Sequence, residues 1–171
     1  AGEMKKMMTT MFTLAIILVL LACSTPSKED VNEPSSKLVA ETPPDLSLII
    51  NGERYSTLLG SYCWEKASER TNEASIECVD KAPPEVLLAD ETPIHVVANA
   101  KGELDIDAPT PPTDMEVTAF LDGEAMDLDS FGQTISFPDE QGSYYYIAWF
   151  SWEDDDRVTN EASYVFAIKV E

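Results

Sequence analysis

Carboxylates gather in two clusters late in the sequence, and these are the residues with the clearest capacity for chemistry. Calcium takes about six to eight oxygen ligands, so acidic connections can supply part of a calcium site, and close carboxylates can also serve hydrolysis. No stretch matches the calcium loop D-x-[DN]-x-[DN]-G, and runs of charge are usually solvated turns. A calcium site, a hydrolytic site and plain solvated turns therefore all stay open as interpretations of these clusters. The candidate ligands are Asp122, Glu124, Asp127 and Asp129 in the first cluster and Asp154, Asp155 and Asp156 in the second.

His95 is the only histidine in the sequence, and it lies in a short apolar stretch typical of a strand. No nucleophile motif, zinc motif or phosphate-binding glycine loop accompanies it. A strand histidine without such a partner is usually structural or exposed, so no catalytic role is predicted and the chain is not expected to be an enzyme.

Cys63 and Cys78 lie in two short apolar stretches joined by a polar link. Alternation of side chains along the first stretch places Tyr62, Trp64 and Leu58 on one face and Cys63 on the other. Neighbouring strands joined by a structural disulfide are the simplest geometry. The alternative, a redox or metal pair, lacks both CxxC spacing and enough histidines.

The densest aromatic stretch runs from 144 to 152. Half of its side chains are expected in the core, and core packing is the default for all of them. The opposite face of the same strand is an alternative binding surface for a peptide or a sugar polymer. The candidate binding residues on this face are Tyr145 and Trp149.

The N-terminal segment has the layout of an export signal. A few residues precede Met4, Lys5 and Lys6 follow it, and an apolar run too short to cross a bilayer ends at Cys23. Leu20-Leu21-Ala22-Cys23 resembles the lipobox of bacterial lipoproteins, which implies that Cys23 carries the lipid and leaves the other two cysteines to pair. We therefore expect a short remnant and a lipoprotein signal peptide over 1–22, a flexible Ser- and Pro-rich tether over 23–44, and one domain over 45–171.

The charge balance limits the partners of this chain. It carries 32 acidic and 11 basic residues, a formal net charge of −21. Nucleic acid is a poor partner for such a surface, whereas cations, basic peptides and basic wall components are better ones. Acidic charge also simply keeps an exported protein soluble, and that interpretation is favoured.

Short apolar strands divided by turn residues predict an all-β domain. Asn51-Gly52 between apolar runs indicates a hairpin, Lys101-Gly102 is expected to form another turn, and the stretch from Asp122 to Phe131 is expected to be an irregular loop. The last two strands resemble those of immunoglobulin-like and fibronectin-type sandwiches, with Tyr144 or Tyr146 as the tyrosine near the start of the penultimate strand. We therefore expect an antiparallel, immunoglobulin-like β-sandwich of roughly seven to nine strands.

The lipobox together with the GSYCW and CVD stretches resembles a loose set of small, uncharacterised surface lipoproteins of Gram-positive bacilli. The resemblance implies a location on the extracytoplasmic face of the cell membrane and a disulfide-tied β fold. It implies no activity. The expected function is a binding or interaction module at the cell envelope, whose partner is an envelope protein or a wall component. The alternatives are a structural or modulatory subunit of an envelope complex, and a calcium-binding or carboxylate-dependent hydrolytic protein.

Overall fold

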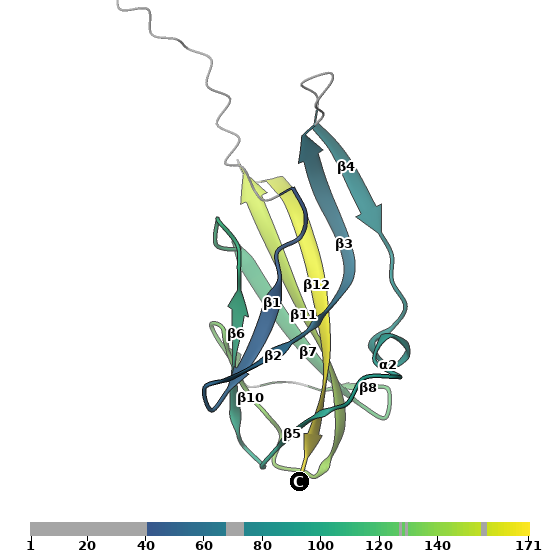
Figure 1. The fold of residues 1–171 in the computed structure, drawn as a ribbon, viewed down its shortest axis with the longest axis vertical. Coiled ribbons are helices and arrows are strands. Elements are labelled where there is room, and N and C mark those ends of the chain that lie inside the picture. The colour runs from purple at the N-terminus through teal and green to yellow at the C-terminus, as the bar shows by residue number, and fades with distance from the viewer. Residues whose placement is uncertain (1–40, 68–73, 127, 129, 155–156) are drawn as a thin grey trace, which may run out of the picture. The chain divides into compact units, whose positions relative to one another are not determined.

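The computed structural model describes residues 41–67, 74–126, 128, 130–154 and 157–171. Within these residues the chain is an all-β sandwich of two sheets with one short helix (Figure 1). The strands are β1 (Leu46–Ile50), β2 (Glu53–Ser56), β3 (Leu58–Ala67), β4 (Ala74–Val79), β5 (Ile94–Val96), β6 (Lys101–Ile106), β7 (Asp114–Leu121), β8 (Glu124–Met126), β9 (Ser130–Phe131), β10 (Thr134–Ser136), β11 (Gly142–Asp154) and β12 (Arg157–Val170), and the helix is α2 (Pro84–Leu87).

The order of the strands is that of an immunoglobulin-like sandwich with additions. One sheet has the order β2-β1-β6-β10-β9 and the other β4-β3-β12-β11-β7-β8, and β5 also pairs with β12. The series β1-β6-β10-β9 and β7-β11-β12 correspond to the A-B-E-D and C-F-G orders of a constant-type immunoglobulin domain. The predicted fold class is confirmed, but the described residues form twelve strands rather than seven to nine, because β2, β3, β4, β5 and β8 extend this frame.

All strand pairs are antiparallel except one. β5 runs parallel to the end of β12, with Ile94 opposite Ile168 and Val96 opposite Val170. The edge of β12 is therefore shared, since β3 pairs with its middle and β5 with its last residues.

The core lies between the two sheets and is built by alternating residues. From the smaller sheet come Leu48, Leu104 and Ile135, and from the larger one the aromatic side chains of β11 and β12. Tyr146 stacks on Phe166, with ring centroids 4.9 Å apart. The aromatic side chains of the 144–152 stretch therefore form the central part of the core.

Tyr144 has the role that the resemblance assigned to it or to Tyr146. Its hydroxyl donates a hydrogen bond to the main-chain oxygen of Glu140, four residues upstream, at 2.8 Å. This is the arrangement of the tyrosine corner in immunoglobulin-like domains. Tyr164 forms a similar anchor, because its hydroxyl donates to the main-chain oxygen of Pro44 just before β1.

Glycines with positive φ form the hairpin turns, and two of the sequence-based expectations about turns are corrected. Asn51 and Gly52 have φ of 52° and 83° and form the predicted hairpin. Asp122 and Gly123 have nearly the same angles, 52° and 84°, and turn β7 into β8, so the expected irregular loop begins with a regular hairpin. Lys101-Gly102 is not a turn but the start of β6. Gly102 is needed there because a Cβ would lie 2.7 Å from Leu48 Cδ1.

Candidate functional site

The outer face of the seven-stranded sheet, meaning the side turned away from the core, holds the candidate site. Along β11, the buried residues Tyr144, Tyr146 and Ala148 alternate with the partly exposed residues Tyr145 and Trp149. The two binding candidates taken from the sequence are therefore on the outer face. The expectation that half of this aromatic stretch is core is confirmed.

Helix α2 covers one part of the outer face. It starts at Pro84, where a proline suits the first helical turn. The following Leu88 is buried in a small cluster with Val165 and Ala167, and Tyr145 is among the partly buried residues that pack against this cluster. Tyr145 is therefore largely a packing residue.

Trp149 lies beyond this covered part. It belongs to neither of the two apolar clusters formed by the described residues. Its directly paired neighbours are Glu116 on β7 and Ser163 on β12. Directly opposite side chains in a sheet are about 5 Å apart at Cβ, so the indole has an exposed carboxylate on one side and a hydroxyl on the other.

A second row of outer-face residues adds two further carboxylates. Ser151 pairs with Asp114 on β7 and with Glu161 on β12. We call Trp149, Ser151, Ser163 and the carboxylates Asp114, Glu116 and Glu161 the Trp149 patch. The ion pairs found among the described residues are Arg54–Asp105, Lys66–Glu77 and His95–Glu171, and none of them involves these three carboxylates.

A β-bulge fixes one border of the patch. Two residues of β3, Gly60 and Ser61, oppose the single residue Ser163 of β12, and the Ser163 hydroxyl donates to the main-chain oxygen of Ser61 at 2.9 Å. Gly60 has no room for a side chain, since a Cβ would lie 2.5 Å from Ser163 Oγ. The bulge also shifts the alternation, so Leu58 lies opposite Val165 on the outer face. The predicted sharing of one face by Leu58, Tyr62 and Trp64 is therefore wrong for Leu58.

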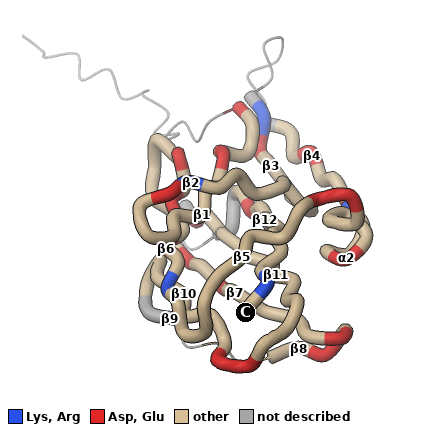
Figure 2. Tube along the Cα trace, turned by 60° about the horizontal axis from the view of Figure 1, so that its bottom comes forward, with Lys and Arg blue, Asp and Glu red and all other residues tan. Residues whose placement is uncertain are grey.

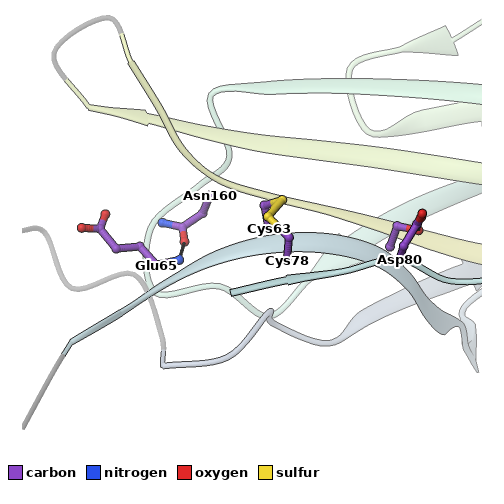
Figure 3. Close-up of a disulfide and its surroundings, with 6 residues drawn as sticks. Cys63, Glu65, Cys78, Asp80 and Asn160 are labelled. Carbon is purple, nitrogen blue, oxygen red and sulfur yellow. Dashed lines mark hydrogen bonds between the residues drawn. A yellow bond between two sulfur atoms is a disulfide. The ribbon is translucent and has the colours of Figure 1, made fainter. Parts of the chain in front are cut away.

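The disulfide lies at the end of the same row of residues. Glu161 pairs with Cys63, which pairs with Cys78, and an S–S bond joins the two cysteines (Figure 3). The predicted pairing of Cys63 with Cys78 between neighbouring strands is confirmed. Behind it, Trp64 packs edge-on against Trp152 in the core, with ring centroids 5.1 Å apart.

Next to the disulfide, a buried amide ties β3 to β12. Asn160 Oδ1 accepts a hydrogen bond from the main-chain N–H of Glu65 at 2.6 Å (Figure 3). At the other end of β4, the Ser61 hydroxyl donates to Asp80 Oδ1 at 3.1 Å and accepts from the Lys81 N–H. The strands that border the Trp149 patch are thus held by covalent and polar links.

The acidic candidates are only partly placed. Asp122 is a turn residue with positive φ, a conformation that asparagine and aspartate tolerate, and Glu124 is the exposed first residue of β8. Asp154 ends β11, and Asp127, Asp129, Asp155 and Asp156 lie outside the described residues. Among the residues that the structure describes, no three metal-binding side chains converge. Figure 2 shows Asp and Glu spread over many connections of the sandwich.

His95 and the surface hollow, which is where a hydrolytic site would be sought, lie in different parts of the molecule. His95 is exposed on β5 and its Nδ1 lies 2.8 Å from Glu171 Oε1, while Ile94 and Val96 pack against the core. A hollow of about 340 Å³ lies on another part of the surface. Asp114 is the only carboxylate among the described residues of its lining, which are Pro111, Pro112, Thr113, Asp114, Met115, Gly132, Gln133 and Phe150.

No protein family model matches the sequence, and no curated protein matches it. None of the helices in the described part of the chain is long and apolar enough to cross a membrane.

Proposed function

We propose that this protein is a lipid-anchored binding module at the extracytoplasmic face of the cell membrane, and that it binds its partner through the Trp149 patch. The lipobox-like Leu20-Leu21-Ala22-Cys23 supports the anchor, and the following Ser- and Pro-rich residues suit a tether. The disulfide between Cys63 and Cys78 suits an oxidising compartment.

The observation that carries the proposal is the position of Trp149. Sheet faces in sandwiches either pack on the core or meet solvent, and this one is partly covered by α2 and the following Leu88. Trp149 and the residues around it form an amphipathic, partly exposed surface in the uncovered part, and tryptophan is enriched among residues that dominate binding energy.

Apolar residues also border the surface. Leu58 on β3 is 37% exposed and lies opposite Val165, against which α2 packs, and Val86 on α2 is 60% exposed. A partner that covers Trp149 and reaches this border would bury apolar area, and the carboxylates of the Trp149 patch would supply polar contacts beside it; protein interfaces likewise combine an apolar centre with a polar rim.

The test of binding is cross-linking in intact cells that carry the full chain. A photoreactive residue at Ser151 keeps Trp149 in place, and the matched control carries it at Glu103, an exposed residue of the smaller sheet. We expect one reproducible species cross-linked from position 151 and absent from position 103, and lost when Trp149→Ala is added. Equal capture from both positions, or none from 151, would refute the proposed surface.

The anchor is tested separately by Cys23→Ala. Without the thiol no thioether-linked lipid can be attached, so the variant should leave the membrane fraction while the wild type remains in it. Persistence of Cys23→Ala in the membrane fraction after a high-salt wash would contradict lipid anchoring. The wash serves as the control for peripheral attachment.

A further inference from the structure

We infer that the Trp149 patch docks an arginine-bearing segment of the partner protein, with a guanidinium stacked on the indole of Trp149 and held by the carboxylates around it. This inference rests on the proposed function, because it names the chemistry of the partner at the same surface.

The negative charges of the patch favour a positively charged ligand. Asp114, Glu116 and Glu161 lie around Trp149 on the outer face, and no ion pair satisfies them within the described residues. Among the described residues, the hydrogen bond that Asp114 Oδ1 accepts comes from the adjacent Met115 N–H, at 2.9 Å. With a chain charge of −21, the long-range field adds to this local attraction and speeds the approach of a basic partner.

The spacing of the carboxylates favours a guanidinium over a metal ion. Asp114 and Glu116 are two residues apart on β7, a spacing of about 7 Å along a strand, and Glu161 is two strands away, about 10 Å. Calcium needs its oxygen ligands within about 2.6 Å, and no three such side chains of the described residues converge on a point. Separated carboxylates beside an aromatic ring suit an extended peptide that carries positive side chains.

Arginine fits this patch better than lysine does. Its flat guanidinium stacks on an aromatic face and its N–H fork binds a carboxylate with two hydrogen bonds. Tryptophan is the aromatic side chain with the strongest cation–π attraction. Glu116 is directly opposite Trp149, so one guanidinium can meet both side chains at once. The partly exposed Ser151 carries a further hydroxyl acceptor, whereas the Ser163 hydroxyl is buried and donates to the Ser61 main-chain oxygen.

The binding test uses the purified full chain in nonionic detergent and three peptide probes titrated calorimetrically: hexa-arginine, hexa-lysine and hexa-citrulline. Citrulline keeps the shape of arginine without the charge. We expect hexa-arginine to bind most tightly and hexa-citrulline not to bind. Trp149→Leu should weaken hexa-arginine by about threefold to thirtyfold, the range given by cation–π energies. Glu116→Gln and Glu161→Gln should each weaken it by about twofold to fivefold.

Glu103→Gln is the matched control, because it removes the same charge from an exposed strand position in the other sheet. It should leave the affinity within about 1.5-fold of wild type, since surface charges beyond a screening length contribute little. Equal losses for Glu103→Gln and Glu116→Gln would show general charge attraction and overturn the inference. Binding of hexa-lysine as tight as that of hexa-arginine would overturn the guanidinium assignment.

The in-cell experiment separates failure of this inference from failure of the proposed function. The double variant Glu116→Gln/Glu161→Gln should abolish cross-linking from Ser151, and hexa-arginine added to cells should compete with it. Cross-linking that persists in both conditions would keep the binding surface but refute an arginine-bearing partner. Capture of a wall polymer instead of a protein would refute it as well, and absence of any capture would refute the proposed function itself.

Discussion

Removal of the Tyr146 hydroxyl should stabilise this protein, although Tyr146 is at the centre of its core. The side chain is fully buried, and its hydroxyl has no hydrogen-bond partner among the described residues. Phenylalanine would keep the stacking on Phe166 and the edge-on contact with Phe137, whose centroid is 5.9 Å away. A buried polar group without a partner costs about 1–3 kcal/mol. We therefore expect Tyr146→Phe to raise the free energy of unfolding by about 1 kcal/mol, after allowance for the small void left by the oxygen.

Two neighbouring tyrosines provide matched controls for the same change. The Tyr164 hydroxyl donates to the Pro44 oxygen and the Tyr144 hydroxyl to the Glu140 oxygen. Removal of the Tyr164 donor leaves the oxygen of the buried Pro44 unsatisfied, so Tyr164→Phe should lower the free energy of unfolding by about 1–2 kcal/mol. Glu140 is exposed and water can replace the Tyr144 hydroxyl there, so Tyr144→Phe should lower it by about 0.5–1 kcal/mol. The sign of the effect therefore differs between identical substitutions within one core.

Urea denaturation at 25 °C and pH 7, followed by tryptophan fluorescence and far-UV circular dichroism, measures all three effects. Coincident transitions and equal m values would establish that the midpoints report stability. A Tyr146→Phe variant that is destabilised as much as Tyr164→Phe would mean that the hydroxyl has a partner in solution, and the assumed cost of an unsatisfied hydroxyl would then be wrong here.

Three further predictions concern the disulfide, the core and high pH. Cys63→Ser should lower the free energy of unfolding by about 2–5 kcal/mol, and an unchanged urea midpoint relative to wild type would contradict a stabilising role of the bridge. Gly102→Ala should cost about 1–3 kcal/mol, because the added methyl would meet Leu48 and Phe137; wild-type stability would show that these side chains move aside. Burial raises the pKa of Tyr146 and Tyr164 in the folded state, so their contribution to stability is complete below the unfolded pKa of about 10 and falls as the pH rises above it. Urea midpoints at pH 9 and 11 should show this fall, smaller in Tyr146→Phe; an equal fall in that variant would contradict the assignment.

Local patterns sufficed to predict much of the fold. Ala162, Tyr164 and Phe166 alternate strictly with outward residues and so mark the last strand in the sequence, and Asn51-Gly52 identified the first hairpin. Each of these signals is formed by residues only a few positions apart. The short strands β9 and β10 were not predicted, since two or three residues carry no detectable period. The parallel pairing of β5 with β12 depends on contacts between residues far apart in the sequence.

The candidate site could be predicted only in part for the same reason. Trp149 could be identified from the sequence, because it is an aromatic residue on the face opposite the core residues of its strand. Glu116 and Glu161 were not, because they become its neighbours through the register of β7 and β12 against β11. The bulge at Gly60 and Ser61 gave no local signal beyond the glycine, yet it decides which side chains of β3 face outward.

The position of β12 determines the order in which the chain can fold. This strand is the last element in the sequence, yet it lies inside its sheet, between β11 on one side and β3 and β5 on the other. The hydrogen bond from Tyr164 to Pro44 spans 120 residues, whereas the cysteines are only 15 apart. While a nascent chain still lacks β12, the β3–β4 hairpin can form and oxidise, but the edge of β3 stays open. Contacts of such long range slow folding and leave that edge exposed to aggregation until β12 has been synthesised.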